Sequence, residues 1–236
     1  MAGHSKWKNI QHRKGAQDKK RAKAFQIASK EIIVAMQNGG TDLSNNPRLK
    51  LAIDKAKAAN VPKDNIQKLI DKSNKDKTNY SEIIYEGYAP GGVAIIIDCL
   101  TDNVNRTVSK VKATLTKKGG QLATTGAVSY LFETKGIIIV DNSINEDKVM
   151  EVALNNDAIN FESEDEIYII ETSPKNWQKT SEAIKELGYK EFIRSEIARV
   201  PSSTVSLDET KREKVENLIE ELEDLEDVSY VTTNLD

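Results

Sequence analysis

Apolar residues in the first part of the chain recur every three or four positions, the spacing of one face of an α-helix. This pattern predicts a helix over Gln17–Asn38, which the pair Gly39-Gly40 ends because glycine takes the left-handed cap without steric cost. Its buried stripe is predicted to be Phe25, Ala28, Ile32 and Met36.

Two shorter helices are predicted next. The first opens at Asn46-Pro47, a side-chain cap followed by a proline at the first helical position, and it buries Leu49, Ala52, Ile53 and Ala56. Val61-Pro62 breaks the chain, and the second helix runs to about Ser73 with Ile66, Leu69 and Ile70 inward. The three helices predict a helical domain, followed by a polar linker over Ser73–Ser81.

The pattern changes at Tyr80, where β-branched and helical segments begin to alternate. Val93–Leu100 predicts a buried strand, Asn103–Lys118 a helix and Ala127–Phe132 a second strand, which together form a β-α-β unit with a right-handed crossover. A second series follows, with strands at Ile137–Val140 and Ile167–Glu171, an extended segment at Phe192–Val200, a weak strand near Phe161, and helices near Asn145–Leu154 and from Ser173-Pro174 to Gly188.

The end of the chain predicts a helix over Asp208–Glu226 and a strand over Val228–Thr232. These two elements complete the β-α-β unit that began at Val93. The predicted fold class is therefore α+β, with a basic three-helix domain (1–79) and two ferredoxin-like domains, the second (133–200) inserted in the first (80–132 plus 201–236). Two consecutive α/β domains remain an alternative.

The formal net charge of −3 hides a strong asymmetry. Residues 1–79 hold 18 basic and 7 acidic residues, a net of +11, whereas residues 80–236 hold 16 and 30, a net of −14. We therefore expect a basic module that meets a polyanion and an acidic body that faces away from it or binds another protein.

The charge is densest in Met1–Lys30, where nine basic residues accompany one acidic residue, Asp18. Such a run favours contact with nucleic-acid phosphates, and Trp7, between Lys6 and Lys8, has the chemistry to stack on an exposed base. The alternative is a solvated face with Trp7 packed on the helices. The predicted nucleic-acid contacts are His4, Lys6, Trp7, Lys8, His12, Arg13, Lys14, Lys19, Lys20, Arg21, Lys23, Arg48, Lys55 and Arg106.

The run Thr101–Thr107 lies where a strand ends and a helix begins. Asp102 or Asn103 is predicted to cap that helix, and Arg106 has the alternative of binding a partner or a phosphate.

Catalytic signatures are absent from the sequence. The one cysteine, Cys99, lies in an apolar run, the two histidines fit no zinc motif, and Pro90-Gly91-Gly92 precedes a strand instead of opening a helix. We therefore predict no enzyme activity, no metal and no cofactor. A single cysteine fits a reducing, cytoplasmic setting, and no apolar run approaches the ~20 residues of a membrane span.

Several of these segments together resemble the YebC family. The resemblance rests on the opening MAGHSKWKNI, His12-Arg13-Lys14, Asn46–Leu49, Leu51–Pro62, Tyr85–Tyr88, Pro90–Val93, Thr101–Thr107 and Gly119-Gly120. It implies three domains and a cytoplasmic bacterial protein of the kind described as probable DNA-binding transcriptional regulators. Related proteins act in translation, including the mitochondrial translational activator of cytochrome oxidase subunit I, and some bacterial members help ribosomes through proline-rich stretches. The resemblance therefore implies either DNA or ribosomal and transfer RNA as the partner.

Overall fold

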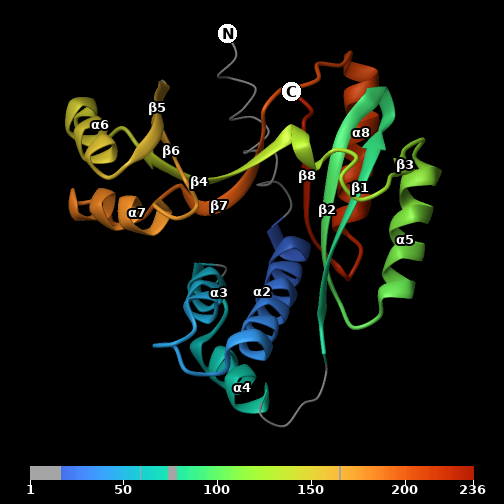
Figure 1. Ribbon diagram of the computed structural model, residues 1–236, viewed down its shortest axis with the longest axis horizontal. Coiled ribbons are helices and arrows are strands. Elements are labelled where there is room, and N and C mark those ends of the chain that lie inside the picture. Colours follow the sequence, from blue (N-terminus) through green and yellow to red (C-terminus); the bar gives the residue numbers. More distant parts are fainter. Residues whose placement is uncertain (1–16, 59, 74–78, 165) are drawn as a thin grey trace. The chain divides into compact units, whose positions relative to one another are not determined.

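A computed structural model of the protein describes residues 17–58, 60–73, 79–164 and 166–236 (Figure 1). Within these ranges the chain forms seven α-helices and two four-stranded antiparallel sheets, which confirms the predicted α+β class. The described residues divide into two compact units. One comprises residues 130–204, and the other comprises residues 17–129 together with 205–236.

Three helices open the larger unit: α2 (Gln17–Gly39), α3 (Pro47–Ala58) and α4 (Lys63–Ser73), called the helical module below. Their apolar faces meet in one core, as the sequence predicts, because the three- and four-residue spacing turns each stripe to the same side. The buried members include Ala28, Ile32, Met36, Leu49, Ala52, Ile53, Ala56 and Ile66, with Phe25, Leu69 and Ile70 packed against them.

Asn46 confirms the predicted start of α3. Its side-chain oxygen accepts a hydrogen bond from the backbone N–H of Leu49 at 2.9 Å, the geometry of a helix N-cap. Its amide group also donates to the carbonyls of Ala35 and Gly40, at 2.8 and 2.7 Å. Asn46 is only 3% exposed, so this one side chain fixes the end of α2 and the start of α3 together.

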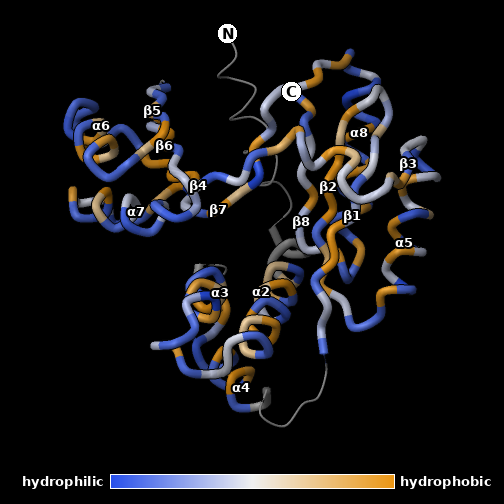
Figure 2. The backbone as a smooth tube through the Cα atoms, in the orientation of Figure 1, coloured by the Kyte–Doolittle hydropathy of each residue, from blue (hydrophilic) through white to orange (hydrophobic). Residues whose placement is uncertain are grey.

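The sheet of the larger unit has the order β3-β1-β2-β8. Its strands are β1 (Ser81–Ala89), β2 (Val93–Thr101), the short β3 (Gln121–Leu122) and β8 (Val228–Thr233). Helices α5 (Val104–Lys117) and α8 (Glu209–Glu223) pack on one face, where Ile95, Ile97 and Cys99 meet Val111, Leu115, Val215, Leu218 and Leu222. Figure 2 shows β2 as a nearly continuous apolar run, which is typical of a central strand.

Strand β1 was not predicted, although it pairs with β2 along its whole length. The two strands form a hairpin through the turn Pro90–Gly92, where Gly91 and Gly92 adopt φ of +82° and +79°. Strand β1 has no apolar run longer than Ile83–Tyr85 and contains two glutamates and a glycine, so it has a weak signal of its own. Its partner β2 supplies the stabilising contacts.

The predicted strand over Ala127–Phe132 is wrong. The strand that closes this β-α-β unit is β3, and residues 123–128 form a loop followed by a short 3₁₀ helix, Ser129–Leu131. A buried carboxylate explains the difference. Glu86 accepts hydrogen bonds from the backbone N–H groups of Gly126, Val128 and Ser129 at 2.7–2.9 Å, so these donors are unavailable to a strand partner.

The smaller unit follows the order β-α-β-β-α-β and confirms a ferredoxin-like fold. Its elements are β4 (Phe132–Asp141), α6 (Glu146–Asn155), β5 (Ala158–Glu164), β6 (Ile167–Thr172), α7 (Trp177–Glu186) and β7 (Arg194–Pro201), with the sheet order β5-β6-β4-β7. Strand β5 contains the weak strand predicted near Phe161. Ile138, Val140, Val149, Tyr168, Ile170 and Ile184 lie in its core.

The chain enters this second sheet at β4, leaves it at β7, and then returns to the first sheet, where β8 pairs with β2. The larger sheet is also four-stranded and antiparallel with two helices on one face, but its strands follow the chain in another order, β3-β1-β2-β8, with β2-α5-β3 as a split β-α-β unit around β1. The predicted fold class, in which one ferredoxin-like domain is inserted in another, is confirmed.

Candidate nucleic-acid interface

The predicted nucleic-acid contacts fall into three groups. The first lies outside the described residues: His4, Lys6, Trp7, Lys8, His12, Arg13 and Lys14. The second lies at the start of α2, where only the backbone is described: Lys19, Lys20 and Arg21. The third is described in full and has partners within the protein: Lys23, Arg48, Lys55 and Arg106.

Lys23, in α2, contacts the far end of the chain. Its ammonium donates to the backbone carbonyl of Leu225, 2.9 Å away and just beyond α8. Carbonyls at a helix C-terminus lack intrahelical partners and lie at the negative end of the helix dipole, so a lysine is stabilising there. Burial lowers the pKa of Lys23, against the raising effect of Glu223 and Asp224.

Lys30, two turns further along α2, is held by three acceptors. Its ammonium donates to the carbonyls of Leu100 and Glu226, at 3.1 and 3.0 Å, and lies 3.3 Å from the Asp227 carboxylate. It also lies 5.6 Å from the centre of the Tyr80 ring. An ammonium has three N–H donors, so the protein itself provides an acceptor for each of them.

The Asp227 carboxylate accepts hydrogen bonds from Lys30 and from two residues of α5. Its side chain is 4% exposed and accepts from the Arg106 guanidinium at 2.8 Å and from the Thr107 hydroxyl at 2.9 Å, besides Lys30. Burial alone would raise the pKa of Asp227, but the hydrogen bonds from Arg106, Thr107 and Lys30 outweigh it and lower the pKa. We call these four residues the Asp227 cluster.

The predicted cap of α5 is Asn103, whose side chain accepts from the Arg106 backbone N–H at 3.0 Å. Asp102, the other candidate, instead pairs with the Arg106 side chain at 2.8 Å. The Arg106 guanidinium therefore has two carboxylate partners, Asp102 and Asp227, and these hydrogen bonds raise its pKa.

Helix α3 contributes the other two contacts. Arg48 forms an ion pair with Glu82 of β1, and Lys55 pairs with Glu31 of α2 at 3.3 Å. The Lys55 ammonium also lies 5.6 Å from the centre of the Tyr230 ring, and the Tyr230 hydroxyl donates to Glu31 at 3.2 Å. Glu31, Lys55 and Tyr230 thus join the helical module to β8.

These contacts divide the basic residues of the helical module by role. Lys23 and Lys30 donate hydrogen bonds to backbone carbonyls, and Lys30, Arg48 and Lys55 form ion pairs with carboxylates of the protein. These contacts orient the module on the first sheet. Lys50, Lys63 and Lys68 are exposed and form no salt bridge with any described residue.

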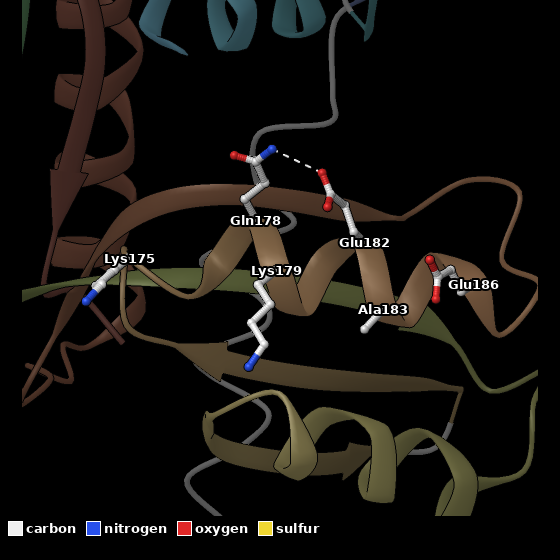
Figure 3. A pocket seen from close by; sticks show the side chains of 6 residues that line it. All are labelled: Lys175, Gln178, Lys179, Glu182, Ala183 and Glu186. Atoms are coloured by element: carbon white, nitrogen blue, oxygen red, sulfur yellow. Dashed lines mark hydrogen bonds between the residues drawn. The ribbon is translucent and has the colours of Figure 1, made fainter.

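The described residues show little that resembles a catalytic site. They contain no group of three or more histidine, cysteine or acidic side chains placed to hold a metal ion. One open hollow of about 420 Å³ lies on α7, lined by Lys175, Gln178, Lys179, Glu182, Ala183 and Glu186 (Figure 3). Within this lining Gln178 donates a hydrogen bond to Glu182, and Lys179 forms an ion pair with Asp157. No described helix is long and apolar enough to cross a membrane.

Known protein families match both the helical module and the two α/β domains. The pattern described as the TACO1/YebC protein N-terminal domain matches residues 5–76, and the pattern described as the TACO1/YebC second and third domain matches residues 80–235. The chain belongs to the TACO1/YebC family. The family resemblance read from the sequence motifs is confirmed.

Close relatives within the TACO1/YebC family cover nearly the whole chain. A probable transcriptional regulatory protein of Lacticaseibacillus paracasei is 48% identical, over 99% of this chain and 97% of the relative. One from Geobacillus kaustophilus is 46% identical, over 100% and 98%. The crystal structure of a conserved hypothetical protein of Aquifex aeolicus has a TM-score of 0.81 at 41% identity, over 93% of this chain and 91% of that one.

Sequence reasoning missed the Asp227 cluster. The sequence shows Lys30 only as part of the basic stretch Met1–Lys30, and it gives Asp227 no feature that separates it from the other acidic residues of the α/β half. The two are 197 residues apart, and no spacing rule links positions so distant. The run Thr101–Thr107 was the one local signal, since it marks the place where β2, α5 and the cluster meet.

Proposed function

We propose that this chain is a cytoplasmic, non-enzymatic regulator that binds nucleic acid through the phosphate backbone, with DNA as its target. The proposed binding domain is residues 1–79. The acidic α/β domains, residues 80–132 plus 201–236 and the inserted residues 133–200, are proposed to face away from the nucleic acid and to offer a surface to a protein partner.

The observation that carries the proposal is the charge that precedes Lys23. Residues 1–22 contain seven lysines and arginines against the single carboxylate of Asp18, a net of +6. The contacts of Lys23 and Lys30 support this assignment, because they use these two cations inside the protein and anchor the part of α2 that follows the basic stretch. Each phosphate contact releases condensed counterions, so binding is expected to weaken steeply with salt.

The name shared by the relatives, probable transcriptional regulatory protein, supports DNA as the target. One structural observation favours RNA as a second candidate. Helix α4 follows a short turn, where a base-reading helix would lie, yet it carries Asp64 and Asp71 among its lysines, and Gln67 donates to Asp71 at 3.0 Å. Such a helix is poorly suited to read bases in the major groove. A ribosome-associated factor that binds ribosomal or transfer RNA by shape and phosphates, and eases synthesis of proline-rich stretches, fits this feature.

Two measurements on one set of variants separate the candidates. The test variant reverses the charge of Lys6, Lys8, Arg13 and Lys14. The control variant reverses four exposed lysines of the inserted domain and so has the same net charge: Lys148, Lys175, Lys185 and Lys190.

Salt-sensitive retention of one promoter fragment over random duplex DNA, lost in the test variant and kept in the control, would support the DNA regulator. Co-sedimentation with ribosomes that shows the same pattern would support the translation factor. Equal behaviour of the two variants in both assays would refute the proposed role of the amino-terminal cations.

A further inference from the structure

The acidic α/β half contains one segment without any acidic residue. Residues 80–236 hold 30 aspartates and glutamates in 157 positions, so a segment of 27 positions would hold about five on average. Residues 103–129 hold none, and they include Arg106, Lys110, Lys112, Lys117 and Lys118. This segment has a net charge of +5, while the rest of the half has a net charge of −19.

The structure places this segment on one surface of the larger unit. It comprises α5, the turn Lys118–Gly120, β3 and the loop that Glu86 holds. Helix α5 buries Thr107, Val111 and Leu115 against the sheet, which leaves its opposite side exposed to solvent. Lys110 and Lys112 are both exposed.

Internal pairing accounts for three of the five cations. Arg106 is held in the Asp227 cluster, and Lys118 pairs with Glu221 of α8 at 2.7 Å, with Lys117 further away at 3.6 Å. Lys110 and Lys112 form no salt bridge with any described residue. Ion pairing with the acidic helix α8 therefore explains why Lys117 and Lys118 are basic, but it does not explain Lys110 or Lys112.

Lys110 and Lys112 are two residues apart, which is about 200° around a helix axis. They therefore lie on opposite flanks of the exposed side of α5, whose middle is formed by short neutral residues such as Ser109 and Ala113. Flexible lysine side chains from both flanks can reach one chain of phosphates that runs along the helix.

We propose that the exposed side of α5, with Lys110 and Lys112, is a second contact surface for the phosphate backbone of the nucleic acid. This inference rests on the proposed function and makes one exception to it: α5 of the α/β half faces the nucleic acid, while the acidic remainder of that half faces away from it. The residue types favour phosphates over a protein partner. Protein interfaces are depleted in lysine and enriched in aromatic residues, and the exposed side of α5 has lysines and no aromatic residue.

The first test is the salt dependence of binding to a DNA duplex and to a structured RNA of equal length. The variant Lys110→Gln/Lys112→Gln is compared with Lys185→Gln/Lys190→Gln, which removes the same charge from exposed sites of the inserted domain. Loss of two phosphate contacts should make the negative slope of log K against log salt shallower by about 1.8 on the DNA duplex. The control variant should keep the wild-type slope.

The second test is site-specific crosslinking. Cys99 is 2% exposed, and burial raises the pKa of its thiol to about 12, so a cysteine introduced on the surface can be labelled selectively. A photocrosslinker on Ser109→Cys should capture the bound nucleic acid, whereas the same label on Gln178→Cys of α7 should not.

An unchanged slope in Lys110→Gln/Lys112→Gln together with no crosslink from position 109 would overturn this inference. The proposed function would survive that result if reversal of the amino-terminal cations still abolished binding. Failure of the wild-type protein to bind either nucleic acid would overturn both.

Discussion

Replacement of Asp227 by asparagine tests whether the Asp227 cluster holds the helical module on the α/β sheet. The variant keeps the shape of the side chain but removes the charge that Lys30 and Arg106 share. It also places an amide N–H₂ donor where the carboxylate accepted hydrogen bonds from Arg106, Thr107 and Lys30. At least one of these donors therefore loses its acceptor in a site that is 4% exposed.

The expected loss of stability follows from how buried each partner is. Removal of one member of a buried ion pair typically costs about 3–5 kcal/mol. Here the Arg106 side chain is 37% exposed and keeps Asp102, and Lys30 keeps the carbonyls of Leu100 and Glu226. We therefore expect the free energy of unfolding of the larger unit to fall by about 2–3 kcal/mol.

Urea titration followed by pulsed hydrogen exchange measures the free energy of unfolding of the larger unit separately from that of residues 130–204. The control is Glu226→Gln, which removes an exposed carboxylate next to Asp227 and should change the free energy by less than about 0.5 kcal/mol. Amides of α2, α5 and β8 should exchange faster in Asp227→Asn alone. Equal stability of the two variants would refute the assigned role of the cluster.

Three further predictions follow from other parts of the structure. Glu86→Gln should destabilise by about 2 kcal/mol and speed exchange of the amides of Gly126, Val128 and Ser129, whereas the exposed Glu82→Gln should not affect them. Gly136→Ala should cost about 1–3 kcal/mol in thermal unfolding of residues 130–204, because its Cβ would lie 2.5 Å from the Cβ of Trp177; an unchanged midpoint would contradict this. Folding lowers the pKa of Asp227 and Glu86, so their stabilisation is present above the ordinary values of 3.8 and 4.5 and is lost as pH falls through the lowered ones. Acid titration should therefore narrow the stability difference between wild type and each variant, and a constant difference would be inconsistent with these shifts.

The parts of the fold that the sequence predicts correctly are those with local signals. The stripe Phe25–Met36, the cap at Asn46 and the start of α8 at Asp208 each depend on residues within a few positions, and each is present in the structure. Strand β1 and the loop 123–128 depend on distant partners. Strand β1 is defined by pairing with β2, and the loop by Glu86, 40 residues from Gly126.

The candidate nucleic-acid interface also has features that the sequence predicts and features that depend on distant partners. Charge density is a property of composition, so the basic character of residues 1–30 is visible in the sequence alone. Which cations are used inside the protein is decided by tertiary contacts. Lys23 and Lys30 look identical to their neighbours in sequence, yet both donate to groups about 200 residues away.

The measurement that tests the central claim most directly is the salt dependence of nucleic-acid affinity in a variant with Lys6, Lys8, Arg13 and Lys14 replaced by glutamine. If these four side chains contact phosphates, the slope of log K against log salt should become shallower by about 3.6 on duplex DNA. The far-ultraviolet circular dichroism of the variant should match that of the wild type. A slope equal to that of the wild type, in a variant that remains folded, would contradict the account.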